Sequence, residues 1–328
     1  MKGTIYQDGK TSPATTDSVK AAVASGEFFW LDLDDAAPDD ADAINLLENT
    51  FKFHHLAVED AEHFGQRPKF EDYDDFIYLV AAGALTDGSD TVEVHVFLTE
   101  KHVVSVHRGA CDAIEAARKR IARHPSSAQE APNIVVTYLI VDSLTDSFFP
   151  VLSAFDDRID DLSADILKKP TDAQMGELFD MKKGLIKIRK VITPQRDMFA
   201  ALSAGVTTVP GMTPETSRYF RDLYDHLIRI SDEVDSYRDL VTGVMDTHMS
   251  VVSNRMNAVM KQLGMIATIF LPLSFITGYF GQNFAYSASG FQTHTWSFLV
   301  FGVGIYAVVI YFMMRLFKKR ELIGGPTN

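Results

Sequence analysis

A stretch without charged side chains, from Gln262 to Met314, limits more than any other feature what this chain can fold into. None of its 53 residues is Asp, Glu, Lys or Arg, whereas the preceding residues carry charge at the density usual for globular domains. Within it lie two apolar segments, residues 264–281 and 296–314. Each is close to the roughly 20 residues that a helix needs to cross a bilayer, so we expect two membrane spans rather than two buried core helices.

Basic residues flank the two predicted spans on one side of the membrane. Two precede the first span and four follow the second: Arg255, Lys261, Arg315, Lys318, Lys319 and Arg320. The connection between the spans contains neither Lys nor Arg. By the positive-inside rule both termini lie in the cytoplasm and the connection lies outside. We therefore expect a multi-pass protein of the cell (inner) membrane.

The charge balance outside the spans is acidic. The net charge of the chain is −13, of which residues 1–130 contribute −12, residues 131–260 contribute −5 and residues 261–328 contribute +4. Phosphate recognition needs clustered Lys and Arg, so a nucleic-acid partner is not expected. We find no phosphate-binding loop and no nucleophile–base pair, and so expect no enzyme. An acidic body suits a protein that handles cations.

The sequence before the spans divides into two parts. Residues 1–130 contain aromatic and β-branched segments typical of strands, separated by segments typical of helices, which predicts a cytoplasmic α/β domain. The predicted strands cover residues 28–35, 76–83, 92–98 and 102–106. Residues 131–261 carry long helical patterns and form the expected cytoplasmic stalk. Residues 262–328 complete an α+β membrane protein with a transmembrane hairpin and a basic cytoplasmic tail.

One face of the last helical pattern carries a stripe of small, polar or unbranched side chains. The stripe residues recur at alternating spacings of four and three: Asp246, Ser250, Ser253, Asn257, Met260, Gly264, Ala267, Leu271, Ser274, Gly278 and Gly281. A 3.5-residue repeat lets helices bundle around a common axis. A tight contact between two membrane helices uses the same kind of residue, and the pattern alone leaves both interpretations open. A two-helix hairpin cannot enclose an aqueous path, so conduction would require several copies.

A short polar motif, Gly281-Gln282-Asn283, follows the apolar run ITGYF at the end of the first span. Other distinctive segments are FWLD (29–32), HHLAVED (54–60), QRPK (66–69), NAVMKQL (257–263) and IFLPLSFITG (269–278). Together these segments resemble the CorA family of magnesium and cobalt channels. Members of that family end their pore helix with Tyr-Gly-Met-Asn and carry two C-terminal spans. The resemblance covers almost the whole chain.

The resemblance implies a funnel-shaped homopentamer whose first span lines the pore, with the second span outside it. It implies a selectivity filter at Gly281, Gln282 and Asn283. The implied pore and gate residues are Asn257, Met260, Leu263, Leu271, Ser274 and Gly278. Asp222 and Asp246 fall where the family's stalk helix carries acids, and they are the expected regulatory metal ligands. The implied function is uptake of Mg²⁺ and Co²⁺ down the membrane potential, gated by cytoplasmic divalent metal.

The sequence departs from the family pattern at two places. Gln282 stands where the family has Met, and residues 284–295 lack the acidic residue that often follows the motif. Because the related ZntB branch also varies at that middle position, a zinc transporter is the main alternative, and Ni²⁺ is a further candidate ion. The non-transport alternative is a membrane-anchored sensor or scaffold, which requires neither the stripe nor the polar motif.

Overall fold

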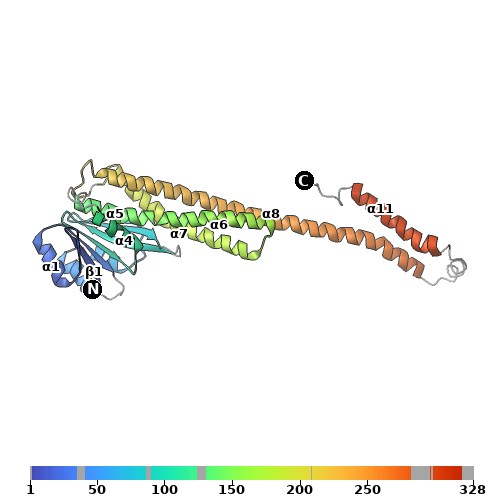
Figure 1. Ribbon diagram of the computed structural model, residues 1–328, viewed down its shortest axis with the longest axis horizontal. Coiled ribbons are helices and arrows are strands. Elements are labelled where there is room, and N and C mark those ends of the chain that lie inside the picture. The colour runs from blue at the N-terminus through green and yellow to red at the C-terminus, as the bar shows by residue number, and fades with distance from the viewer. Residues whose placement is uncertain are drawn as a thin grey trace. The chain divides into compact units, whose positions relative to one another are not determined.

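The computed structural model of the chain describes residues 2–34, 41–85, 90–123, 131–207, 209–281, 296 and 298–319 (Figure 1). The chain forms two compact units, Met1–Asp246 and Thr247–Asn328, and each is considered by itself. Helix α8 (Ser217–Gly281) begins in the first unit and ends in the second. The predicted connection between the spans, which includes Gln282 and Asn283, lies outside the described residues.

A seven-stranded sheet with the order β2-β1-β3-β7-β6-β5-β4 organises the first unit. Its strands are β1 (Gly3–Gln7), β2 (Lys10–Pro13), β3 (Phe29–Asp34), β4 (Lys69–Asp72), β5 (Ile77–Ala84), β6 (Thr91–Leu98) and β7 (His102–His107). Neighbouring strands are antiparallel except β3 and β7, which are parallel. The four strands predicted from the sequence correspond to β3, β5, β6 and β7.

Both faces of the sheet are buried. Along β5, Ile77 and Leu79 join one apolar core, whereas Tyr78 and Val80 join the other, because successive side chains of a strand point to opposite faces. A strand buried on both faces reads as a continuous apolar run, which is why β5 was recognisable in the sequence. The Tyr78 face is covered by α1 (Thr16–Ser25), α2 (Ala41–Asn45), the π-helical turn η1 (Leu46–Thr50) and α3 (His55–Glu62).

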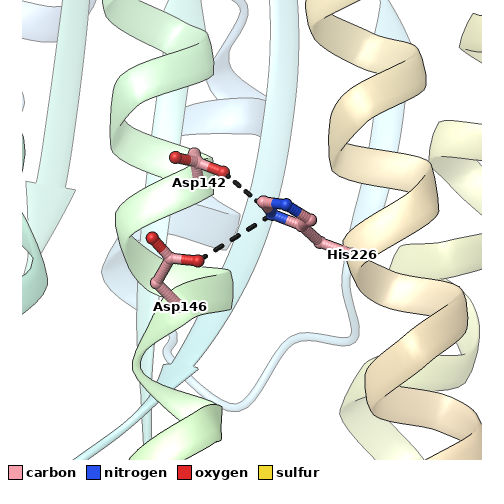
Figure 2. Close-up of side chains that lie close together, drawn as sticks. All are labelled: Asp142, Asp146 and His226. Atoms are coloured by element: carbon pink, nitrogen blue, oxygen red, sulfur yellow. Dashed lines mark ion pairs between the residues drawn. The ribbon is translucent and has the colours of Figure 1, made fainter.

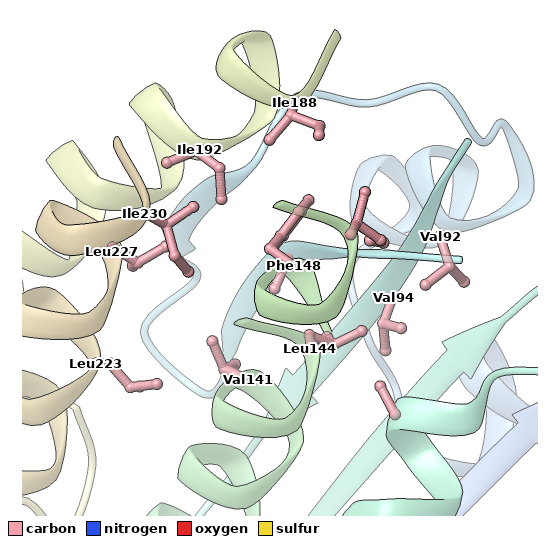
Figure 3. Packing of buried hydrophobic residues seen from close by; sticks show 14 of the residues in the cluster. Val92, Val94, Val141, Leu144, Phe148, Ile188, Ile192, Leu223, Leu227 and Ile230 are labelled. Carbon is pink, nitrogen blue, oxygen red and sulfur yellow. The ribbon is translucent and has the colours of Figure 1, made fainter. Parts of the chain in front are cut away.

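Long helices cover the other face of the sheet. They are α4 (Asp112–Arg123), α5 (Pro132–Asp146), α6 (Phe148–Lys168), α7 (Asp172–Ser203) and the first part of α8. Figure 3 shows Leu144 and Phe148 between the β6 side chains and those of α7 and α8. The segment Pro132–Lys168 is long and apolar enough to cross a membrane, but 72% of its most apolar window is buried in the first unit. It is therefore core.

Helix α5 approaches the sheet closely at Gly83. A Cβ atom at this position would lie 2.8 Å from the Leu144 carbonyl oxygen and 2.8 Å from the Ser147 hydroxyl. Two side chains bond the adjoining strand backbone: the Ala82 N–H donates to Gln195 Oε1 at 2.9 Å, and the Ala84 N–H donates to Ser147 Oγ at 2.7 Å. The small residue and these polar contacts fix α5 and α7 against β5.

The second unit consists of the end of α8, the π-helical segment η2 (Phe298–Gly304) and α11 (Ile305–Lys319). The candidate span within Ser217–Tyr279 is 0% buried, in contrast to the buried Pro132–Lys168 segment. Large apolar side chains of the second predicted span are exposed as well, among them Val308 and Phe312. Exposed apolar surface on this scale requires a lipid or protein neighbour.

Candidate functional site

The predicted pore residues lie on a single helix, α8. Gly281 is its last residue, and Gln282 and Asn283 lie outside the described part of the chain. The six predicted pore and gate residues from Asn257 to Gly278 are all helical, and each of them is exposed in the single chain. Leu271 is the extreme case, at 77% exposure. Among the residues that the structure describes, nothing buries this face of α8.

Proline 272 interrupts the hydrogen-bond ladder of α8 within the predicted span. Proline has no N–H, so the carbonyl of Thr268, four residues earlier, lacks its usual helical donor. Two threonine hydroxyls bond backward on either side of the proline: Thr268 Oγ1 donates to the Gly264 carbonyl at 2.7 Å and Thr277 Oγ1 donates to the Leu273 carbonyl at 2.8 Å. Such bonds keep the hydroxyls satisfied in an apolar environment.

A cluster of possible metal ligands lies in the first unit. Asp142 and Asp146, one turn apart on α5, face His226 of α8 (Figure 2). His226 Nδ1 lies 3.3 Å from Asp142 Oδ1 and 3.8 Å from Asp146 Oδ1. One ligand atom from each of the three side chains lies within 4.8 Å of the other two. These three residues are called the α5–α8 cluster below.

Two further acidic and basic groups border the α5–α8 cluster. Asp222 Oδ1 lies 4.0 Å from His226 Nε2, and the Tyr138 hydroxyl donates to Asp222 Oδ2 at 2.8 Å. Arg120 Nη1 binds Asp142 Oδ2 at 2.5 Å and lies 3.9 Å from Asp146 Oδ2. These side chains supply three carboxylates and one guanidinium, an excess of acidic groups that favours a cation.

Within the cluster, the carboxyl of Asp146 has a shifted pKa. Burial and then repulsion from Asp142 raise the pKa of the Asp146 carboxyl, while His226 and Arg120 act in the opposite direction. The Asp142 side chain is only 3% exposed, yet it keeps the Arg120 guanidinium as a partner. The cluster thus holds one well-paired carboxylate and one that favours a proton or a cation.

The donor atoms suit a metal ion. Asp142 Oδ1 and His226 Nδ1 are buried, and the 3.3 Å between them lacks hydrogen-bond geometry, so neither atom has a hydrogen-bond partner. An unprotonated ring nitrogen and a carboxylate oxygen are both acceptors, and a cation between them would satisfy both. Asp146 would supply a third ligand to the same ion. Imidazole with carboxylates suits Zn²⁺ or Co²⁺ better than Mg²⁺.

The structure separates the two predicted regulatory residues. Asp222 borders the α5–α8 cluster, whereas Asp246 lies 24 residues further along α8, on the order of 36 Å away at 1.5 Å per residue. Within one chain they cannot share an ion. Asp142, Asp146 and His226 were not predicted as metal ligands from the sequence. A signal was present, since Asp142 and Asp146, like Asp222 and His226, are four residues apart on one helix face.

The fold and the exposed apolar helix agree with a family of metal-ion transporters. Residues 25–319 match the family model described as "CorA-like Mg2+ transporter protein". The match covers most of the chain, so the chain belongs to the CorA family. The resemblance inferred from the sequence segments is thereby confirmed, and the family is one of membrane transporters.

Individual relatives agree with this assignment. The cobalt/magnesium transport protein CorA of Thermotoga maritima is 32% identical over 284 residues, which cover 85% of this chain and 80% of that protein. The zinc transport protein ZntB of Yersinia enterocolitica is 27% identical over 283 residues, covering 85% and 84%. The solved structure of the CorA magnesium transporter from Methanocaldococcus jannaschii shares the fold, with a TM-score of 0.79 at 20% identity over 98% of this chain and 99% of that one.

Proposed function

We propose that this chain is a channel for divalent metal cations that takes up Mg²⁺, and Co²⁺ with it, as a funnel-shaped homopentamer. The observation that carries the proposal is the apolar stretch of α8, of which no part is buried and whose small and polar stripe leads to Gly281-Gln282-Asn283. Five copies of this stripe around one axis would cover the exposed face and enclose a path. Both termini would be cytoplasmic and the protein would reside in the cell (inner) membrane.

Neutral oxygen groups at the outer end of the pore suit a hydrated ion. Mg²⁺ gives up its water reluctantly, so amide and carbonyl oxygens that bond to the hydrated ion are better than carboxylates that must strip it. A site that binds too strongly would also prevent release. Five Asn283 amides would meet both conditions, with Gly281 allowing close approach of the helix ends and Gln282 adding further amides.

The membrane potential is sufficient to drive uptake. An inside-negative potential supplies about 2.3 kcal/mol per elementary charge for each 100 mV, and a divalent ion gains roughly twice that. The apolar side chains of Met260 and Leu263, with Asn257 below them, would close the path by excluding water. Leu271, Ser274 and Gly278 would line the path between this gate and the filter.

Cytoplasmic metal would act as the regulator at the α5–α8 cluster. Its excess negative charge, the two unpartnered acceptors and the neighbouring Asp222 support a cation site there. An ion bound between α5 and α8 would hold α8 in one position relative to α5, which packs on the sheet. Loss of the ion would release α8 and open the gate. Asp246 would belong to a separate acidic site, made with a neighbouring subunit.

A zinc transporter is the second candidate function. The ZntB relative and the imidazole-containing donor set of the α5–α8 cluster favour it. The predicted spans contain no Asp, Glu or Lys, so they offer no carboxylate or amine to relay protons, which speaks against coupling of zinc to a proton gradient. A membrane-anchored sensor or scaffold remains the non-transport alternative.

Uptake of ions into liposomes containing the purified protein distinguishes these functions. Initial uptake of Mg²⁺, Co²⁺, Ni²⁺ and Zn²⁺ is compared with and without a pH gradient. We expect Mg²⁺ and Co²⁺ uptake that is indifferent to the pH gradient and is reduced at least about tenfold in Asn283→Ala. Uptake of Zn²⁺ alone, accelerated by the pH gradient, would support the ZntB-like alternative. Vesicles impermeable to all four ions would support a scaffold.

A further inference from the structure

A hydrogen bond joins the two predicted spans within the second unit. The hydroxyls of Thr277 on α8 and Tyr306 on α11 lie 2.9 Å apart. Each side chain comes from a different helix and neither is charged. Between helices in a membrane, hydrogen bonds of this kind contribute to association because water does not compete for the hydroxyls.

The direction of the bond follows from the other contact of Thr277. A threonine hydroxyl has one hydrogen, and Thr277 Oγ1 donates it to the Leu273 carbonyl at 2.8 Å. Its lone pairs remain available, so the Tyr306 O–H donates and Thr277 Oγ1 accepts. Tyr306 therefore binds a hydroxyl that is itself hydrogen-bonded to the α8 backbone. Because the Thr277 side chain is held in this way, the contact constrains the helix and not only the side chain.

Thr277 lies where such a constraint has most effect. Pro272 removes a ladder hydrogen bond five residues before it, and helices bend at such points. Gly281, the last residue of α8, is one turn after it. On a helical wheel Gly281, Ser274 and Gly278 lie roughly 40°, 60° and 100° to the same side of Thr277. A contact at Thr277 can therefore hold the segment beyond Pro272 while leaving the stripe free.

We propose that Tyr306 is a positioning residue for ion selection: its hydrogen bond to Thr277 fixes the orientation of the α8 segment after Pro272 and thereby the filter that begins at Gly281. This inference rests on the proposed role of α8 as the pore helix. In this proposal the second span influences ion selectivity through Tyr306, although Tyr306 does not touch the ion.

Two substitutions that keep side-chain size test the proposal. Tyr306→Phe and Thr277→Val each remove one partner, and the double variant removes both. We expect each single variant to shift the ratio of Mg²⁺ to Co²⁺ initial uptake rates by about threefold, the factor that corresponds to roughly 0.6 kcal/mol for an average hydrogen bond between membrane helices. The double variant should shift the ratio no further than the larger single shift, because both changes abolish the same bond.

Matched controls separate positioning from general destabilisation. Thr277→Ser retains the accepting oxygen and should keep the native ratio, and so should Tyr311→Phe, which removes a hydroxyl from an exposed ring on the same helix. A native ratio in Tyr306→Phe, or shifts that multiply in the double variant, would overturn the proposal. So would a shift of the same size in Tyr311→Phe.

A second readout distinguishes failure of this inference from failure of the proposed function. The thermal unfolding midpoints of the same four proteins, wild type, two single variants and the double variant, measure the coupling of the two hydroxyls whether or not ions pass. Non-additive midpoints support the bond, and additive midpoints overturn it. If the wild type passes no ion, the channel function and the positioning role fall together, even where the coupling is found.

Discussion

At the scale of single residues, the α5–α8 cluster combines an imidazole with two carboxylates that differ in their surroundings. Asp142 is buried and paired with Arg120, whereas the pKa of Asp146 is raised by burial and by the charge of Asp142. A carboxyl group must lose its proton to bind a metal ion, so protons and metal compete at Asp146. The cluster should therefore sense pH as well as metal.

The pH dependence of metal binding follows from this direction of shift. As the pH falls through the raised pKa of Asp146, the carboxyl takes up a proton and the affinity for Co²⁺ should fall, whereas at higher pH binding should release protons. Calorimetric titration of the purified full-length protein with Co²⁺ at about pH 5 and about pH 7 measures this. Asp146→Asn should bind more weakly at the higher pH and show a smaller difference between the two.

Substitution of a second cluster residue, and of an aspartate outside the cluster, tests the metal site further. His226→Gln should weaken Co²⁺ binding about tenfold or more, since even residues that only orient metal ligands are worth about 10- to 100-fold. Asp180→Asn removes the same charge as Asp146→Asn from an exposed position on α7 and should change neither the affinity nor its pH dependence. Equal affinities in wild type, Asp146→Asn and His226→Gln would contradict a metal site at the cluster.

This cluster also marks the limit of what the sequence could reveal about residues. The stripe and the polar motif on α8 were recognisable because they are local patterns on one helix. Asp142 and His226 are more than 80 residues apart and meet only because α5 and α8 pack together against the sheet. Asp222 was singled out through the family resemblance, and its neighbours His226 and Tyr138 became evident only in the structure.

At the scale of elements, the sheet of the first unit depends on close contact between β5 and α5. The pair is packed so tightly at Gly83 that a methyl group would meet the Leu144 carbonyl and the Ser147 hydroxyl. Since the Leu144 carbonyl is backbone, a side chain at Gly83 would have to displace α5 itself. The same helix carries Asp142 and Asp146, so this contact also places the cluster.

Replacement of this glycine tests the packing. Gly83→Ala should lower the free energy of unfolding by about 1–3 kcal/mol, the usual cost of overpacking, and should weaken Co²⁺ binding at the cluster. Gly176→Ala is a matched control, because a Cβ at this α7 position meets no atom within 4 Å and alanine favours helix. Denaturant unfolding followed by circular dichroism gives both values. A Gly83→Ala protein as stable as Gly176→Ala would contradict the close contact.

Elements differed in how well the sequence predicted them. β3, β5, β6 and β7 were predicted because their apolar runs reflect burial on both faces. β1, β2 and β4 were missed: β1 buries only Ile5, β2 is exposed along its length, and β4 is short and charged, so none of them forms a continuous apolar run. The apolar segment Pro132–Lys168, for which the sequence predicted a long helical pattern, folds as two consecutive helices, α5 and α6, in the first unit.

At the scale of the whole molecule, the charged side chains are distributed unevenly: an acidic part precedes an apolar part that contains no charged residue. The first 260 residues carry all but one of the 44 acidic side chains, and the stretch from Gln262 to Met314 carries none. In the proposed channel, an acidic body on the cytoplasmic side would attract divalent cations to the α5–α8 cluster and to the inner end of the pore. Membership of the CorA family links these two parts to the transport of metal ions.

Voltage-driven uptake of Mg²⁺ into sealed vesicles containing the purified protein tests the central claim most directly. An inside-negative potential set by a potassium gradient supplies roughly 4.6 kcal/mol per divalent ion for each 100 mV, so Mg²⁺ should enter against an opposing concentration gradient and without ATP. Internal Mg²⁺ is followed with an entrapped indicator. The account predicts uptake that rises with the imposed potential and is largely lost in Asn283→Ala. Uptake that ignores the potential, or that is unchanged in this variant, would contradict it.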